Sequence, residues 1–504
     1  MGSDAIDSSL VVKLTQLLSG KVVVSAEIGE NDIAGMDIEA LAVKIIKHFE
    51  GAGIAILTND ELKKIISEGN DKTPITVEVI RSNGFKAEAK DVKPDFSVRN
   101  LELEKTGGAV ADFSEYFDDR YKKIKEIITN GRNGTIGSMI NNISNIKNYG
   151  DGREISVCGI VYDKHITKNG HLLVTLEDET GYAKVLFLKT GGTNEIFESG
   201  RRLINDDIVI VKGKISGPFV IANSILWPDV PIRSRRKGED DVAIAFFSDI
   251  HIGSKLFLDK QFKKAIAWLN GGLNYRNDLA GKVKYVIMDG DVADGIGVYP
   301  EQERDLSVDD MYKQHSILLD FIDAIPDYIE VFVLPGNHDA VQRSEPQPPF
   351  PNDLIGGFAK GNVHFVSNPS YIKINGVNLL TYHGTSLDSV IQSIPNCSYS
   401  KPEEAMKELL KRRHLSPIYG GNIVVPSKND PLVIDQVPDI LHMGHIHKNG
   451  VAEYHGTLLI NSGTWQARTA FQVRQGHIPT PGILPVYEIK SMNYSEIDFN
   501  SELW

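Results

Sequence analysis

Cysteine is scarce in this chain, and long apolar runs are missing. Only Cys158 and Cys397 occur in 504 residues, which excludes a disulfide framework, and their spacing does not fit a cysteine metal site. No stretch approaches the roughly 18 consecutive apolar residues of a membrane-spanning helix, and the acidic, polar N-terminus is unlike a secretory signal. We therefore expect an intracellular, cytoplasmic protein without a membrane partner, in which Cys158 is a packed free thiol.

An excess of basic residues is also missing. The chain has 54 Lys and Arg against 67 Asp and Glu, and its formal net charge is −13. A protein that holds nucleic acid by itself is usually basic or carries a long basic stripe. A short basic cluster, Arg233–Lys237 (RSRRK), is either a solvated linker or a phosphate-contacting patch. If nucleic acid is involved, another subunit is expected to hold most of it.

The first third of the chain changes character near residue 68. With 504 residues, the chain exceeds one compact core and should form two to four domains. Residues 1–67 are predicted to form a small helical domain, because residues 38–49 place apolar side chains at helical spacing and Thr58–Asp60 resembles a helix N-cap. Residues 68–110 are polar and interrupted by Gly and Pro, which indicates a flexible linker. The helical domain either docks a partner or packs as an N-terminal unit.

Residues 111–232 are predicted to form a small β-barrel preceded by a helix. The helix is expected near residues 113–128, and several short strands separated by turns follow between 135 and 230. Their order, with a gap large enough for a helix between the third and fourth strands, resembles an OB-fold. OB-folds often bind single-stranded nucleic acid through basic grooves with stacking aromatics. Aromatics are sparse in this region, so a structural or protein-binding barrel is favoured.

Residues 233–504 repeat a pattern of strand, polar loop and helix. Each of five apolar strands is followed directly by side chains that can bind metals. Strand ends of α/β sheets are where active sites lie, because the strands are rigid and open onto loops. The five strands are expected over residues 242–247, 284–288, 329–334, 377–381 and 440–443.

The side chains that follow these strands are imidazoles, carboxylates and one amide, with no thiolate. This donor set suits divalent ions such as Mn²⁺, Fe²⁺ or Zn²⁺ and argues against a structural cysteine zinc site. The set is too large for one tetrahedral ion and suits two ions that share a bridging ligand. Two ions about 3.5–4 Å apart can clamp a phosphate and activate a water molecule. In the Asp-x-His and His-x-His pairs, both side chains of an extended segment point to one side. The candidate ligands are Asp249, His251, Asp291, Asn337, His383, His445 and His447.

The order of the motifs identifies a family. Asp-x-His, Gly-Asp, Gly-Asn-His-Asp, His-Gly and Gly-His-x-His resemble the calcineurin-like metallophosphoesterase superfamily over about residues 241–490. With the OB-like barrel and the helical N-terminus, the whole chain is similar to the small subunits of archaeal family D DNA polymerases. The resemblance implies a multidomain α/β and β fold: a small helical N-terminal domain, an OB-fold-like β-barrel and a calcineurin-like α/β sandwich. The small subunits of eukaryotic replicative polymerases lack an intact metal set, whereas no ligand position is missing here.

The resemblance also implies roles for the ligands. A first metal would be bound by Asp249, His251 and His447, a second by Asn337, His383 and His445, and both by Asp291. His338 would lie near the scissile phosphate, where it stabilises charge or protonates the leaving oxygen. Asp339 would accept a hydrogen bond from His338 and fix its tautomer.

The function implied by the resemblance is a 3′–5′ exonuclease subunit that proofreads for a DNA polymerase. Its cofactors would be two divalent ions, Mn²⁺ in the first place and Fe²⁺, Zn²⁺ or Mg²⁺ as alternatives. Its partners would be the large catalytic subunit and DNA, either single-stranded or at a primer 3′ end. The residues by themselves support only two-metal phosphoester hydrolysis. A free-standing metallophosphatase or phosphodiesterase and a non-catalytic polymerase accessory subunit therefore stay open.

Overall fold

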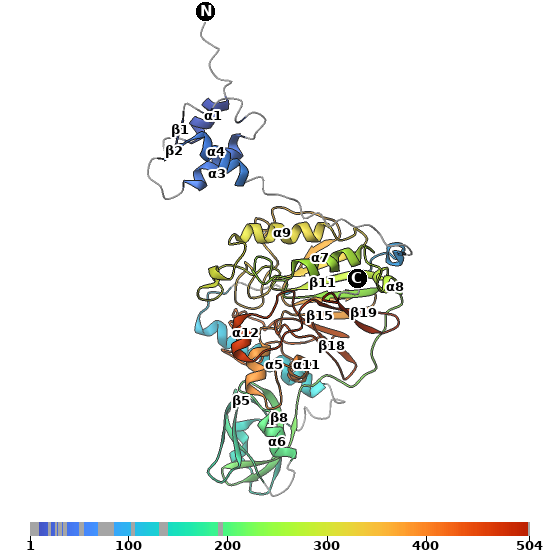
Figure 1. The fold of residues 1–504 in the computed structure, drawn as a ribbon. Helices are drawn as coiled ribbons and strands as arrows, with labels where there is room; N and C mark the ends of the chain where they lie inside the picture. The colour runs from blue at the N-terminus through green and yellow to red at the C-terminus, as the bar shows by residue number, and fades with distance from the viewer. Residues whose placement is uncertain are drawn as a thin grey trace, which may run out of the picture. The chain divides into compact units, whose positions relative to one another are not determined.

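The chain divides into two compact units, residues 1–76 and 77–504, each with its own hydrophobic core (Figure 1). The structure is a computed structural model. The described residues are 10–18, 22–25, 28, 33, 38–49, 55–68, 85–101, 106–130, 140–189 and 195–501.

The first unit is mainly helical, as predicted, and also contains a small strand pair. Its helices are α1 (Leu10–Leu17), α3 (Ile38–His48) and α4 (Asn59–Glu68), and β1 (Val22–Val24) pairs in parallel with β2 (Ala55–Leu57). The predicted N-cap of α4 is confirmed. The Thr58 Oγ1 accepts from the backbone N–H of Glu61 at 3.3 Å, and the Glu61 carboxylate accepts from the Thr58 N–H at 3.0 Å, which is a reciprocal capping box.

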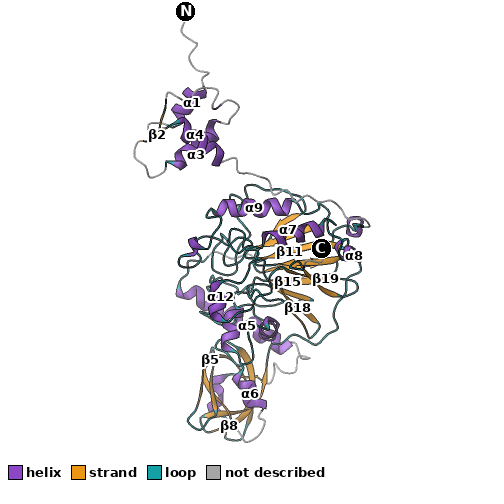
Figure 2. Ribbon diagram, in the orientation of Figure 1, coloured by secondary structure: helices purple, strands orange, loops and turns teal. Residues whose placement is uncertain are grey.

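The described residues between 140 and 226 form a closed β-barrel, which confirms the predicted barrel (Figure 2). The ring consists of β5 (Glu154–Ile166), β6 (Leu172–Asp178), β7 (Gly181–Phe187), β9 (Phe219–Leu226) and β8 (Ile208–Ser216), with β4 (Ile140–Asn141) beside β5. Strand β5 pairs with β6 and with β8, which closes the ring. Helix α6 (Glu195–Arg201) lies in the predicted gap between the third and fourth strands.

Two six-stranded sheets form the largest part of the second unit. The order in the first sheet is β13 (Val363–Phe365), β12 (Glu330–Leu334), β11 (Val283–Asp289), β10 (Ala243–Phe247), β19 (Ile483–Glu488) and β20 (Tyr494–Asp498). The order in the second is β17 (Gly450–Tyr454), β18 (Thr457–Asn461), β16 (Ile440–Met443), β15 (Val377–Thr381), β14 (Ser370–Ile374) and β3 (Phe96–Asn100).

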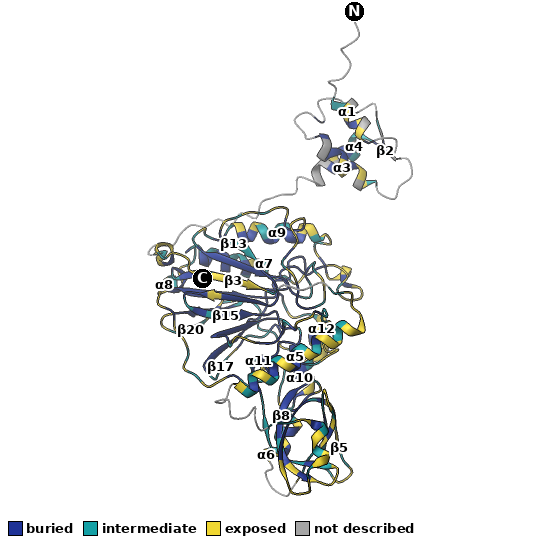
Figure 3. Cartoon of the chain, turned by 180° about the vertical axis from the view of Figure 1, so that it is seen from behind, coloured by how far each residue is buried: buried dark blue, intermediate teal, exposed yellow. Residues whose placement is uncertain are grey.

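The two sheets pack face to face and are covered by helices on their outer faces. Side chains such as Ile244 and Phe332 of the first sheet share a core with Ile372 and Ile460 of the second. Helices α7 (Asp259–Leu269) and α9 (Met311–Asp323) lie on the first sheet, whereas α10 (Leu387–Ser393) and α11 (Pro402–Arg412) pack on the second. The central strands are buried on both faces (Figure 3), which explains their continuous apolar runs.

The parallel strands end at the same edges of their sheets. Strands β10, β11 and β12 are mutually parallel in the first sheet, and β15, β16 and β18 are parallel in the second. The five strands predicted from apolar runs correspond to β10, β11, β12, β15 and β16, with boundaries that differ by one residue at most. The loops that carry the candidate ligands therefore leave from rigid, buried elements.

The linker predicted over residues 68–110 is wrong for residues 85–101. A 3₁₀ turn, η1 (Glu88–Asp91), buries Ala89 in the core between the sheets, and β3 pairs antiparallel with β14 along its whole length. An edge strand buries one face only, so its mixed sequence gives a weak pattern. The second sheet thus begins before the predicted boundary at residue 233. Residues 69–84 and 102–105 lie outside the described part of the chain.

Helix α5 (Val110–Asn130) joins the barrel to the sandwich. The helix was predicted over residues 113–128, and its residues Tyr121 and Ile124 pack with Cys158 of the barrel and with Val433. Cys158 is a buried free thiol, as predicted, and burial raises its pKa to about 11.

A buried ion pair reinforces this junction. Arg120 of α5 donates from Nε to Asp430 Oδ2 at 2.6 Å, and both side chains are almost completely buried. The His414 Nε2 lies 2.8 Å from the same oxygen. Burial raises the pKa of Asp430, but Arg120 and His414 outweigh it and hold the pKa below its usual range.

The RSRRK cluster is partly built into the sandwich. Arg233 pairs with Asp439 at 2.9 Å, and Arg235 donates to the Met492 carbonyl at 2.8 Å. These two arginines are structural, which neither sequence-based interpretation anticipated. Arg236 and Lys237 are exposed.

Replacing Asp430 should destabilise the second unit strongly. We expect Asp430→Asn to reduce its free energy of unfolding by about 3–5 kcal/mol, because Arg120 would stay buried without a counter-charge. Urea denaturation of the full chain measures this. Glu198→Gln breaks an exposed pair with Arg201 and should cost at most about 1 kcal/mol. Equal midpoints for the two variants would contradict the expectation.

Candidate metal centre

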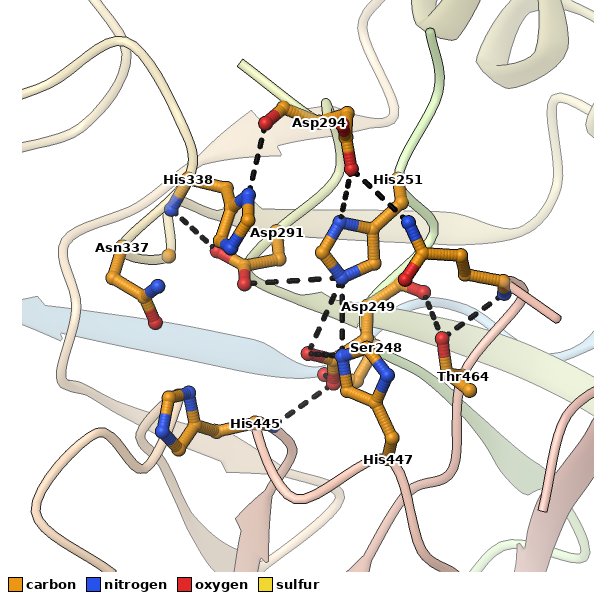
Figure 4. A network of polar contacts seen from close by, with 12 residues as sticks. Ser248, Asp249, His251, Asp291, Asp294, Asn337, His338, His445, His447 and Thr464 are labelled. Carbon is orange, nitrogen blue, oxygen red and sulfur yellow. Dashed lines mark hydrogen bonds and ion pairs between the residues drawn. The ribbon is translucent and has the colours of Figure 1, made fainter. Parts of the chain in front are cut away.

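The loops after five strands bring the candidate ligands together, and Figure 4 labels all of them except His383. Donor atoms from three overlapping sets of side chains lie within 4.8 Å of one another in each set. The sets are Asp249, His251 and His447; His251, Asp291 and His338; and Asp291, His383 and His445. The Oδ1 of Asn337 lies 3.1 Å from the Nε2 of His383, which adds the last predicted ligand.

The first group surrounds the carboxylate of Asp249. Its Oδ1 lies 3.2 Å from the Nε2 of His447 and 4.0 Å from the Nε2 of His251. The two imidazole nitrogens lie 3.1 Å from each other. The Oδ1 is buried and receives no hydrogen bond from a described residue. Two imidazole nitrogens and a buried oxygen that converge in this way fit a divalent cation.

The second group surrounds Asp291, which also reaches the first. The Oδ2 of Asp291 lies 3.3 Å from the Nε2 of His383 and 4.0 Å from the Nε2 of His251. The His445 donor atom lies within 4.8 Å of both Asp291 and His383. Asp291 therefore lies between the two groups, where a bridging ligand would have to be. The residues fit a pair of ions.

The backbone at these ligands is strained. A positive φ is unusual for residues with a β-carbon and costs about 1–3 kcal/mol at each position. Such residues persist where the surrounding structure fixes them, and they cluster at functional sites. Five candidate ligands have this conformation: Asp249 (52°), His251 (55°), Asp291 (48°), His445 (65°) and His447 (57°).

Two glycines of the motifs are required by close approach. A β-carbon at Gly336 would overlap the carboxylate and backbone of Asp291, and one at Gly444 would overlap the hydroxyl of Ser248. The motifs therefore contain glycine at these positions because the loops of different strands nearly touch there.

The charges in the centre depend on each other. Burial raises the pKa of Asp291, but His383 and His338 outweigh burial, and the net pKa lies well below the usual range. Burial lowers the pKa of His383, but Asp291 raises it well above its ordinary value. For His251, burial is outweighed by the hydrogen bond to Asp294 and by nearby carboxylates, and the pKa rises to about 9. The buried carboxylates thus require positive charge beside them.

Asp294 supports two site residues, although it carries no motif signal beyond its place three residues after Asp291. Its Oδ1 lies 2.9 Å from the Nδ1 of His251, and its carbonyl oxygen lies 2.9 Å from the Nδ1 of His338 (Figure 4). These contacts hold the two rings edge to face, with centroids 4.9 Å apart. The carboxylate also orients His251 as a carboxylate behind a metal-binding histidine does.

The hydrogen bond predicted between Asp339 and His338 is wrong. The Asp339 carboxylate accepts from the backbone N–H groups of Gly336 at 2.8 Å, Ala293 at 2.9 Å and Val292 at 3.3 Å. The His338 ring bonds instead to the carbonyl of Asp294. Asp339 therefore ties the loop after β12 to the loop after β11.

The two histidines of the Gly-His-x-His motif are each supported by a surface element. The Nε2 of His445 lies 3.0 Å from Oδ2 of Asp388 in α10. The Nδ1 of His447 lies 2.8 Å from the side-chain amide nitrogen of Gln472 in α12 (Ala470–Gln475). In this orientation the amide donates to Nδ1, so binding of a cation at Nε2 of His447 requires the amide to turn and present its oxygen instead. Neither partner was predicted from the sequence.

His442, which is close in sequence, lies outside the three donor sets. It is fully buried, its Nε2 lies 2.8 Å from the Ser462 hydroxyl, and burial lowers its pKa to about 3.

Comparison with known proteins decides the family. The model of the alpha/epsilon B-subunit family of DNA polymerases matches residues 244–450. The DNA polymerase II small subunit of Archaeoglobus fulgidus is 43% identical over 383 residues, covering 75% of each chain. The chain belongs to the DNA polymerase II small subunit family. The family's member from Thermoplasma acidophilum is 34% identical over 474 residues, which covers 91% of this chain and 93% of the relative.

The resemblance to archaeal polymerase small subunits is therefore confirmed. Among solved structures, Vacuolar Protein Sorting 29 from Cryptosporidium parvum is 16% identical, and the match covers 51% of this chain and 97% of that one, with a TM-score of 0.25. No helix among the described residues is long and apolar enough to span a membrane.

Replacing Asp294 should weaken metal binding. We expect Asp294→Asn to lower the affinity for Mn²⁺ by about 10- to 100-fold, because His251 loses its charged partner. Isothermal titration of Mn²⁺ into the full chain measures the change. Asp309→Asn, at an exposed site, removes the same charge as a control. Equal affinities of the two variants would rule out this role for Asp294.

Proposed function

We propose that this chain is a metal-dependent phosphodiesterase that removes nucleotides from DNA 3′ ends, as the proofreading subunit of a DNA polymerase. The observation that carries the proposal is the position of Asp291 between two groups of donors. A pair of divalent ions in such groups supplies positive charge to a phosphate and a water of lowered pKa. The nitrogen and oxygen donors suit several divalent ions; we take Mn²⁺ from the family resemblance, with Fe²⁺, Zn²⁺ or Mg²⁺ as alternatives.

The chain itself would hold the ions and orient the substrate. One ion would be held by Asp249, His251 and His447, the other by Asn337, His383 and His445, and both by Asp291. Rigid strand ends and strained loops fix these side chains before a substrate binds. Positioning of the phosphate would follow from that fixed geometry.

His338 is the residue we propose as catalyst. Its ring is only partly buried, and its Nδ1 is occupied by the carbonyl of Asp294 at 2.9 Å. A carbonyl can only accept, so Nδ1 carries the proton and Nε2 is left to face a substrate oxygen. In the protonated ring, Nε2–H would donate to the phosphate in the transition state or to the leaving oxygen.

The nucleic-acid substrate and the partner are proposed from family membership. A polymerase small subunit has a large catalytic subunit as its natural partner, and DNA ends are the phosphodiesters within its reach. The net charge of −13 makes strong DNA binding by this chain alone unfavourable, so the large subunit would supply most of the affinity.

Two substitutions should separate catalysis from metal binding. We expect His338→Ala to retain Mn²⁺ and to lose about 10²- to 10⁴-fold in hydrolysis rate, the usual contribution of a general acid. Asp291→Ala should lose metal as well, because it contributes to both groups. Single-turnover hydrolysis and Mn²⁺ titration measure the two effects. The control His165→Ala changes an exposed histidine of the barrel and should alter neither. Full hydrolysis by His338→Ala would refute its role.

The direction of digestion is tested with end-labelled DNA. We expect the full chain with Mn²⁺ to shorten a 5′-labelled strand progressively and to release the label of a 3′-labelled strand as mononucleotide. If the isolated chain is inactive, the assay is repeated with the large subunit. Inactivity of that complex, with intact metal binding, would favour a non-catalytic accessory subunit. Hydrolysis of a small chromogenic ester without DNA digestion would favour a phosphatase.

A further inference from the structure

The segment 468–480 lies directly over one of the candidate ligands. The amide nitrogen of Gln472 is 2.8 Å from the Nδ1 of His447, and the backbone N–H of Thr480 donates to the His447 carbonyl at 2.9 Å. The ring of His477 packs against Tyr399, with centroids 4.0 Å apart. The segment is therefore attached at several points to the candidate metal centre and its rim.

This segment exposes large apolar side chains. Phe471 is 59%, Val473 55% and Ile478 69% exposed. In α12 itself, only Gln472 is buried. Isolated apolar residues on a surface are ordinary, but three in one short segment next to a candidate catalytic centre indicate a surface that is covered during function.

The segment is also positive in an acidic chain. Residues 454–487 contain no Asp or Glu, although the chain has 67 of them. Arg468 and Arg474 lie on either side of Phe471 in the sequence, and both are exposed. Neither forms an ion pair within the described part of the chain. Two exposed guanidinium groups without an ion pair in the described residues, close in sequence to an exposed aromatic ring, favour a polyanion over an ordinary protein surface.

We propose that segment 468–480 binds the unpaired nucleic-acid strand that leads into the metal centre. Arg468 and Arg474 contact phosphates of the strand, and Phe471 stacks on a base. Proteins that bind single strands without sequence preference combine such cations with such rings. The inference rests on the proposed function, because it names the substrate strand of the same centre.

Binding of a fluorescent single-stranded oligonucleotide at low ionic strength tests this surface without requiring hydrolysis. We expect the double variant Arg468→Gln, Arg474→Gln to lower the slope of log affinity against log salt by about 1.4, since each phosphate contact to a single strand contributes about 0.7. Phe471→Ala should weaken binding by about tenfold or more through loss of one stacked base. Fluorescence anisotropy with the full chain measures both.

The matched control is the double variant Arg236→Gln, Lys237→Gln. It removes the same charge from exposed positions before β10, and it should leave the binding by the chain unchanged. A larger loss of oligonucleotide affinity in the Arg468/Arg474 double variant than in the control supports the proposal. Equal loss, or no binding by the unsubstituted chain, overturns it.

Hydrolysis adds an independent comparison. We expect the ratio of kcat/KM for the oligonucleotide to kcat/KM for bis(p-nitrophenyl) phosphate to fall in the Phe471→Ala and arginine variants, because the small diester does not reach the segment. Failure of hydrolysis with normal oligonucleotide binding would affect only the proposed function. Loss of large-subunit binding with unchanged oligonucleotide affinity would overturn the inference and assign the surface to that partner.

Discussion

Two buried carboxylates set the conditions for the rest of this molecule. Asp249 and Asp291 lie in the interior at the edge of a sandwich, where like charges repel strongly and water cannot screen them. They stay ionised only because positive charge is brought to them. The imidazoles that do so come from the loops after β10, β12, β15 and β16, so both sheets must end in the same place. The two buried carboxylates therefore need imidazoles from both sheets, and this need explains why the strand ends of the two sheets meet at the centre.

The stability of the sandwich makes this arrangement possible. Several candidate ligands adopt a left-handed backbone, and imidazole rings of the candidate centre pack against one another. Such strain persists when the surroundings fix it, and here the surroundings are strands buried on both faces. Backbone hydrogen bonds between loops add to this: the N–H of Asp249 donates to the Gly290 carbonyl at 3.0 Å, and that of His251 to the Asp291 carbonyl at 2.9 Å. The loops of neighbouring strands therefore hold one another in the strained conformation.

The parts of the structure that could be predicted from the sequence are those with a strong local pattern. Strands β10, β11, β12, β15 and β16 are continuous apolar runs that end in polar motifs, so both their position and their cluster of ligands follow from the residues. Strand β3 buries a single face and pairs with a strand 270 residues later, which no local pattern can reveal. The contacts of Asp339 and Asp294 depend on how the loops after β11 and β12 pack against each other. That Asp339 follows His338 in the sequence therefore did not predict its hydrogen-bond partners. Gln472 was missed for a related reason, since it is distant in sequence from the ligand that it contacts.

Helix α12 is short, and its residue Gln472 contacts the candidate ligand His447. A helix of this length is not stable by itself in water, and its capping box uses the Gln472 oxygen, which accepts from the Thr469 N–H at 3.1 Å. The nitrogen of the same amide reaches His447. In this orientation of the amide, one planar group caps the first turn of the helix and restrains the ring. Unwinding of the first turn of the helix would therefore also remove one of the restraints on the His447 ring.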